Sequence, residues 1–276
     1  MDKKIIIAAI LVVLFGALIL FQDRVSSLLY FGSDEKMSDS FFTVPPTNVS
    51  STSVLVPKKT VINEVRPVGI GEAVLPFYAG RDPGEIRPVP EEVKIFSEEQ
   101  KNKLFSLITT HAKIVKESPN SFDNWIQLGI LKKTIGDFEG ARDAWEYVSV
   151  ITPLNSVSFA NLGELYWRYL HDYPKSEKNF LLSVKNKPGD VETYISLSGL
   201  YFYSYEEKKN LADDILFDGL KDNPGDVNLI RALASLYEKQ KDYPKALEWW
   251  KKVLEREPGN QEVAKTIEDL DKKIGK

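Results

Sequence analysis

The triplet Pro258-Gly259-Asn260 decides the fold, because four similar triplets precede it along the chain. Each consists of a proline, one further residue and a residue of the type that caps a helix: Pro119-Asn120-Ser121, Pro153-Leu154-Asn155, Pro188-Gly189-Asp190 and Pro224-Gly225-Asp226. The prolines are separated by 34, 35, 36 and 34 residues. Proline ends one helix, and the Asp, Asn or Ser accepts a hydrogen bond from the free N–H groups that open the next. A fixed period in this range indicates stacked helical repeats.

The intervals between the prolines share a pattern of small and aromatic residues. Small residues recur in the first expected helix of each interval, at Gly129, Gly163, Ser198 and Ala234. Small residues also recur in the second expected helix, at Ala141, Ser176, Ala212 and Ala246. We expect the two helices to approach closely at these positions. Aromatic side chains fill the remaining space, and their burial supplies much of the energy of such a core.

This pattern resembles the tetratricopeptide repeat, which has W-x2-L-G-x2-Y in its first helix and A-x3-F before a proline in its second. The resemblance departs at Lys132, where the first unit lacks the tyrosine. It implies an all-α fold, a right-handed α-solenoid of helix-turn-helix units. The predicted repeats are residues 122–155, 156–190, 191–226 and 227–260.

Both ends of the array are expected to be atypical, because terminal repeats cap the stack. Residues 97–121 form a predicted half-repeat that begins with Ser97 as N-cap and an acidic first turn. Residues 261–276 are highly charged and form a predicted capping helix. The repeat domain is therefore expected to span residues 96–276.

The first 33 residues contain a candidate membrane anchor. Ile5 to Phe21 is a run of seventeen residues without a charge, long enough to span about 25 Å as a helix. A cleaved signal peptide is the alternative, but no A-x-A-like cleavage site follows. We predict a retained signal-anchor helix within residues 1–33. Lys3 and Lys4 favour a cytoplasmic N-terminus, which places the repeats outside the cytoplasm, in a bacterial cell envelope.

Residues 34–95 form a predicted extended linker. Eight prolines and four glycines in this segment exclude long helices. Apolar runs such as Val54-Leu55-Val56 and Ala73–Tyr78 are interspersed with them. Two interpretations stay open: a flexible spacer, or a docking arm that binds the repeat domain or a partner.

The sequence contains no recognisable catalytic, cofactor-binding or metal-binding motif. It has no cysteine and only two histidines, His111 and His171, with no spacing that suggests a metal site. The net charge of −4 argues against broad nucleic-acid binding. We therefore predict that the protein is not an enzyme and uses no cofactor, metal or nucleic acid.

The resemblance implies a concave groove lined by the first helix of each unit. Carried over, the predicted groove residues are Ala160, Asn161, Glu164, Trp167, Arg168, Ile195, Gly199, Phe202, Tyr203 and Arg231. Trp167 and Phe202 are interpreted either as anchors for a peptide or as packing residues. Arg168 and Arg231 favour an acidic or C-terminal peptide segment. Asn161 alone matches a clamp that some family members use for chaperone C-termini, so that ligand is not predicted.

These features together predict a membrane-anchored scaffold or adaptor. It would bind a protein partner through the groove and help to assemble a cell-envelope complex. One alternative is a structural subunit of a large multichain membrane assembly, with the Pro-rich arm as its main contact. Another is an organellar receptor whose repeats face the cytosol.

Overall fold

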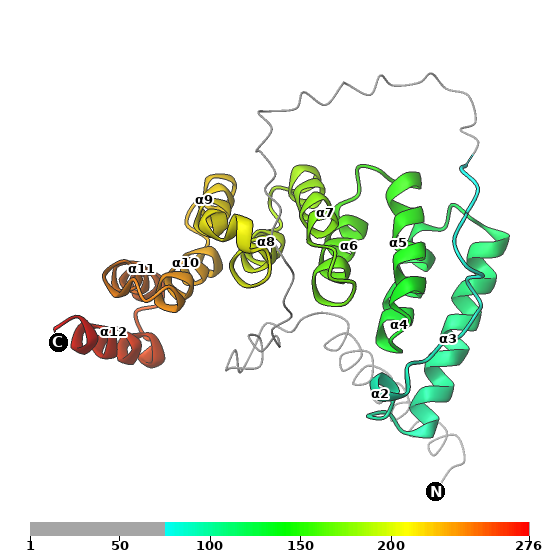
Figure 1. Cartoon of the computed structure of the whole chain (residues 1–276), viewed down its shortest axis with the longest axis horizontal. Helices are drawn as coiled ribbons and strands as arrows, with labels where there is room; N and C mark the ends of the chain where they lie inside the picture. Colours follow the sequence, from blue (N-terminus) through cyan, green and yellow to red (C-terminus); the bar gives the residue numbers. More distant parts are fainter. Residues whose placement is uncertain (1–74, 276) are drawn as a thin grey trace, which may run out of the picture. The chain divides into compact units, whose positions relative to one another are not determined.

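Helices joined by short turns follow one another along the part of the chain that the structure describes (Figure 1). The computed structural model describes residues 75–275, which belong to one compact unit, Val74–Lys276. The helices are α2 (Pro90–Val93), α3 (Glu98–Glu117), α4 (Phe122–Thr134), α5 (Phe138–Ile151), α6 (Ser156–Arg168), α7 (Tyr173–Asn186), α8 (Val191–Tyr203), the 3-10 helix η2 (Glu206–Leu211), α9 (Ala212–Asp222), α10 (Val227–Lys239), α11 (Tyr243–Arg256) and α12 (Gln261–Ile274).

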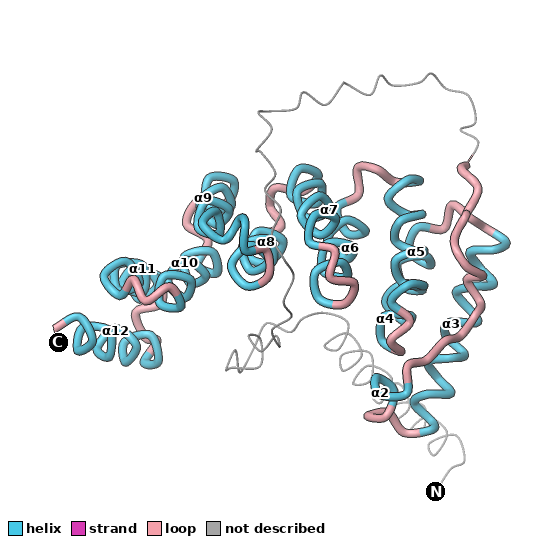
Figure 2. The backbone as a smooth tube through the Cα atoms, in the orientation of Figure 1, coloured by secondary structure: helices cyan, strands magenta, loops and turns pink. Residues whose placement is uncertain are grey.

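The prediction of an all-α fold is confirmed for residues 75–275, which contain helices and loops but no strand (Figure 2). The predicted anchor at residues 5–21 and most of the linker lie outside the described residues. Among the helices that are described, none is both long and apolar enough to cross a membrane. The anchor and its topology therefore stay predictions.

The residue two positions after each repeat proline is the N-cap of a helix, as the sequence predicts, but the side chains of Ser121 and Asp190 make no capping hydrogen bond. Asn155, Asp226 and Asn260 are N-caps whose side chains accept hydrogen bonds from the first turns of α6, α10 and α12. Ser97 forms a capping box with Gln100 at the start of α3. Each such bond satisfies a backbone N–H that has no partner inside the helix.

A second set of caps was not predicted. Asp137, Asp172 and Asp242 start α5, α7 and α11, and each accepts a hydrogen bond from the backbone N–H three residues later. The residue before each aspartate has a positive φ: 81° at Gly136, 53° at His171 and 63° at Lys241. The repeated Asp-Phe or Asp-Tyr pairs in the sequence were the available signal.

Small residues allow the two helices of one repeat to approach closely. A Cβ added at Gly163 of α6 would lie 2.5 Å from Cδ1 of Phe180 on α7. The Ser176 hydroxyl donates to the carbonyl of the same glycine at 2.6 Å. The predicted contact of Gly163 with the second helix of its own unit is therefore confirmed.

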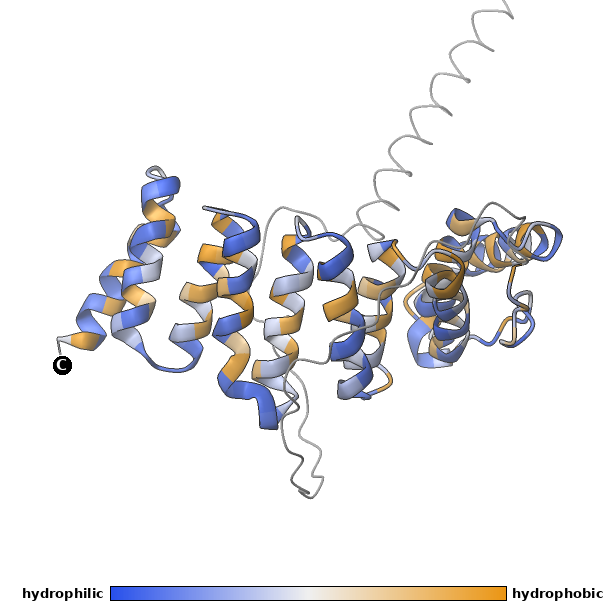
Figure 3. Cartoon of the chain, turned by 90° about the horizontal axis from the view of Figure 1, so that it is seen from above, coloured by the Kyte–Doolittle hydropathy of each residue, from blue (hydrophilic) through white to orange (hydrophobic). Residues whose placement is uncertain are grey.

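Each helix carries both hydrophobic and hydrophilic residues (Figure 3). Neighbouring helices in the chain pack against one another from α3 to α12. Tyrosines in the first helix of repeats two to four also reach back to the preceding repeat. They donate hydrogen bonds to carboxylates of its second helix: Tyr166 to Glu146, Tyr201 to Glu177 and Tyr237 to Asp213.

The described part of the linker packs on the first repeat. The Tyr78 ring lies 4.6 Å from that of Trp125 and 5.4 Å from that of Tyr147, measured between centroids. Lys132, the residue that replaces the repeat tyrosine, is only 3 % exposed. Its Nζ atom donates to the Glu85 carbonyl at 2.6 Å, so the linker supplies the partner that a preceding repeat supplies elsewhere.

Candidate protein-binding surface

The ten predicted groove residues come from three helices. Residues 160–168 lie on α6, residues 195–203 lie on α8, and Arg231 lies on α10. Because α8 packs against both α6 and α10, the fold brings the three helices together. We call the set of ten residues the groove set. Five of its members are half-buried and carry no charge: Ala160, Asn161, Ile195, Gly199 and Phe202.

Trp167 is a buried member of the groove set. Its side chain is 7 % exposed, and its Nε1 atom donates to Oγ of Ser204 at 2.8 Å. A Cβ added at Gly199 would lie 2.8 Å from Cη2 of the ring. The ring therefore packs α6 against α8, as one of the two interpretations of this residue expected.

Phe202 and Tyr203 form an aromatic pair at the end of α8. Their ring centroids are 4.6 Å apart in an edge-to-face arrangement, and Tyr203 is 36 % exposed. Burial of the phenol raises the pKa of Tyr203 to about 12. The pair thus offers apolar surface and a neutral hydroxyl group at neutral pH, a combination that is enriched at protein interfaces.

The two arginines of the groove set already have partners. The Arg168 guanidinium lies 4.1 Å from the Trp167 ring centroid, and its Nε atom is 3.6 Å from Glu164. Arg231 Nη2 donates to both carboxylate oxygens of Glu257, each at 2.8 Å. An acidic partner would have to compete with Glu257 for Arg231. The attraction of an acidic segment to these arginines stays a prediction.

Comparison with known protein families finds a match to one of the predicted repeats. Residues 227–260 match the tetratricopeptide repeat model. These residues are identified as a tetratricopeptide repeat. The matched residues coincide with the fourth predicted repeat, which holds α10 and α11. No curated protein matches the sequence.

Solved structures similar to this chain share low sequence identity with it. MamA is 17 % identical to this chain and has a TM-score of 0.47. The match covers 58 % of this chain and 92 % of the MamA chain. YrrB, described as a TPR protein with an unusual peptide-binding site, is 15 % identical and has a TM-score of 0.43. The match covers 55 % of this chain and 77 % of the YrrB chain. The C-terminal part of a TPR repeat-containing protein of Cytophaga hutchinsonii is 20 % identical and has a TM-score of 0.49. The match covers 60 % of this chain and 67 % of the other.

One exposed aromatic residue beside the groove set was not predicted from the tetratricopeptide repeat pattern. Tyr169 follows Arg168 directly and is 37 % exposed. Its ring stacks on Phe138 with a centroid distance of 4.4 Å, and Lys133 Nζ lies 5.9 Å from it. The signal was the insertion after the first helix of repeat two, which places Tyr169 outside the family pattern.

The histidines have structural surroundings. His111 Nδ1 lies 2.8 Å from Oδ1 of Asn124, and His171 occupies the positive-φ turn before Asp172. Within residues 75–275, no three His, Cys, Asp or Glu side chains are grouped so that they could hold a metal ion.

Proposed function

We propose that this tetratricopeptide repeat protein is a scaffold that binds a protein partner along the groove set of α6 and α8. Stacked helix pairs create extended concave surfaces that repeat proteins use for binding. The observation that carries the proposal is the partly exposed Phe202–Tyr203 pair beside the half-buried, uncharged groove residues. Trp167 packs on Gly199 and thereby holds α6 and α8 together at this surface.

The finer proposal is that the scaffold is membrane-anchored and assembles a cell-envelope complex. It rests on the apolar run Ile5–Phe21 and on the two lysines before it. In the alternative, the Pro-rich arm is the main contact with the partner. The described residues of that arm give this alternative less support. Residues 76–89 already hydrogen-bond to the first repeat of their own chain.

Crosslinking of the full chain in intact cells, followed by mass spectrometry, should identify the partner. A chain with Phe202→Ala and Tyr203→Ala should then capture that partner at least tenfold more weakly than the wild type, because aromatic anchors dominate such interfaces. Leu154→Ala is the matched control, since Leu154 is 84 % exposed and lies in the α5–α6 turn outside the groove set. Full capture by the folded double variant would exclude this surface as the binding site.

Intact-mass measurement tests the anchor separately. The membrane-extracted chain should retain residues 5–21. A mature chain that starts after Phe21 would overturn the anchored form of the proposal and leave the scaffold function unaffected.

A further inference from the structure

Residues 76–89 cross the first repeat as a non-helical segment with one turn at residues 82–85, and we call them the arm segment. Four main-chain groups of the arm segment hydrogen-bond to α4, α5 or the turn between them. Binding through main-chain groups at several points is typical of the recognition of an extended peptide. The four bonds run from Tyr147 Oη to Pro76 O (3.2 Å), from Arg81 N to Asp143 Oδ2 (3.2 Å), from Lys132 Nζ to Glu85 O (2.6 Å) and from Val89 N to Ile135 O (2.8 Å).

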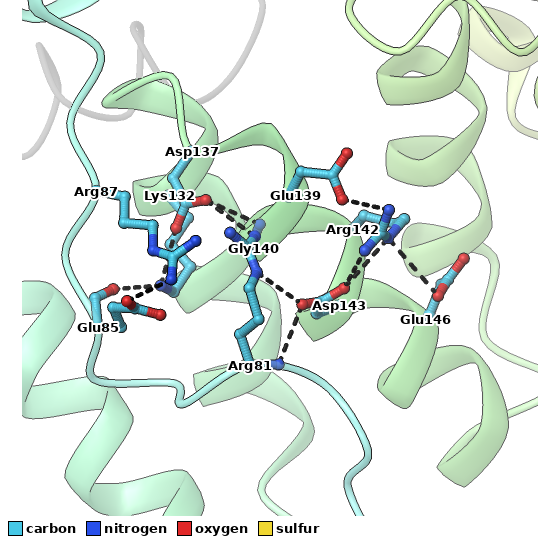
Figure 4. A network of polar contacts seen from close by, with 10 residues as sticks. All are labelled: Arg81, Glu85, Arg87, Lys132, Asp137, Glu139, Gly140, Arg142, Asp143 and Glu146. Atoms are coloured by element: carbon cyan, nitrogen blue, oxygen red, sulfur yellow. Dashed lines mark hydrogen bonds and ion pairs between the residues drawn. The ribbon is translucent and has the colours of Figure 1, made fainter.

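Arg81 is the charged anchor of the arm segment. Its Nε atom donates to Asp143 Oδ2 at 3.1 Å, and its Nη2 atom donates to Asp137 Oδ1 at 3.0 Å (Figure 4). The two carboxylates are almost fully buried, with side-chain exposures of 7 % and 4 %. A planar guanidinium with several fixed N–H donors bridges two such carboxylates in a way that a lysine cannot.

Tyr78 is the aromatic anchor. Its ring packs on Trp125 and Tyr147, and burial raises the pKa of its hydroxyl group. Phe77, the residue before Tyr78, points away from the repeat and is 91 % exposed. The arm segment therefore enters and leaves its site at the surface and is held by side chains at a few points.

The two buried carboxylates also have partners within the first repeat. Asp137 accepts a hydrogen bond from Gly140 N at 3.0 Å and pairs with Lys132 Nζ at 3.1 Å. Asp143 Oδ1 accepts from Arg142 Nη2 at 2.7 Å. Burial alone would raise the pKa of Asp143, but the hydrogen bonds from Arg142 and Arg81 lower it. Both carboxylates therefore have hydrogen-bond partners within the first repeat in addition to Arg81.

We propose that this face of the first repeat is a recognition site for an extended Tyr-x-x-Arg segment, which residues 76–89 occupy in cis. A separate chain that carries the same segment fills the site in trans once the covalent link is cut. This site involves α4 and α5 and is distinct from the groove set, so it stands independently of the proposed function.

The test uses the full chain with a protease site inserted between Ile95 and Phe96, where Ile95 is 76 % exposed in the turn before α3. After cleavage, a fluorescent peptide of residues 75–95 is added in excess, and its binding is followed by anisotropy. The peptide should bind the cleaved protein and displace the original segment. A peptide with Arg81→Ala should bind at least tenfold more weakly, because two buried carboxylates lose a shared donor.

Arg87→Ala provides the matched control peptide. Arg87 is an exposed arginine that pairs with Glu85 of the arm segment itself, so its loss should leave binding unchanged. The uncleaved chain should not bind the peptide, because its site is filled. The proposal is overturned if the cleaved segment never exchanges, if the repeats unfold when it leaves, or if the Arg81→Ala peptide binds as tightly as the wild type.

Discussion

The indole ring of Trp167 occupies the space beside Gly199 on the next repeat, where a Cβ would lie 2.8 Å from the ring. Because Trp167 is on α6 and Gly199 is on α8, this contact joins repeats two and three. The bond from the indole to Ser204 reinforces the same junction. A residue that the repeat pattern places on the groove is thus mainly a packing residue.

Trp167→Ala should therefore destabilise the protein. Truncation of a buried tryptophan leaves a cavity and costs about 3–5 kcal/mol. Phe202→Ala, a change at a partly buried ring, should cost clearly less. Thermal unfolding followed by circular dichroism compares the two variants, and equal midpoints would contradict the packing role of Trp167.

Gly163→Leu should also destabilise the protein, by about 1–3 kcal/mol or more, since a side chain here would collide with Phe180. Gly259→Ala is the matched control, because a Cβ there meets no atom within 4 Å. A melting temperature unchanged by the leucine would show that α6 and α7 do not meet at Gly163.

Glycine substitutions at His171 and Lys241 should stabilise the protein. Both residues have a positive φ, which costs a non-glycine residue about 1–2 kcal/mol. The greater freedom of glycine in the unfolded chain offsets about 0.5–1 kcal/mol of this gain.

The reverse change, Gly136→Ala, should destabilise the protein. Here φ is 81°, and the added Cβ would lie 2.7 Å from Cβ of Val89. Denaturant unfolding of the three single variants checks these signs. Destabilisation by both new glycines would refute the strain assigned to these turns.

Stability should fall in acid partly through Glu257. Hydrogen bonds from Arg231 and Asn260 lower the pKa of this carboxyl below its ordinary value of 4.5. Its contribution is therefore fully present above about pH 4.5 and is lost as the pH falls through the lower pKa of the folded state. Glu257→Gln should flatten the dependence of the melting temperature on pH between about 5 and 3. Glu255→Gln, at an exposed position of α11, should leave the slope unchanged.

The sequence predicts features that lie within one repeat better than contacts between distant segments. Caps such as Asn260 and the close approach at Gly163 follow from residue type and spacing, because the partners of a cap lie at most three residues apart and Gly163 and Phe180 lie in the same unit. The caps at Asp172 and Asp242 were predictable from their repeated Asp-Tyr pairs. The packing of Trp167 was not, because it depends on the absence of a side chain on the neighbouring repeat.

The bridge from Arg81 to the first repeat lies beyond any local pattern. Its partners Asp137 and Asp143 are 56 and 62 residues away in sequence. Likewise, the repeat register placed Arg231 on the groove without indicating that Glu257, 26 residues later, binds it. The groove set as a binding site and the anchor at residues 5–21 stay predictions.

The buried Lys132 prevents the first repeat from being duplicated into the interior of the array. Repeats two and three could each be duplicated in tandem, because Glu177 or Asp213 on the second helix would accept a hydrogen bond from the tyrosine of the copy that follows. A copy of the first repeat inserted in the interior would instead bury an ammonium group away from the Glu85 carbonyl, and loss of one partner of a buried charge is costly. Gene duplication can therefore lengthen this protein at its second or third repeat, whereas its first repeat is confined to the place where the arm segment meets it.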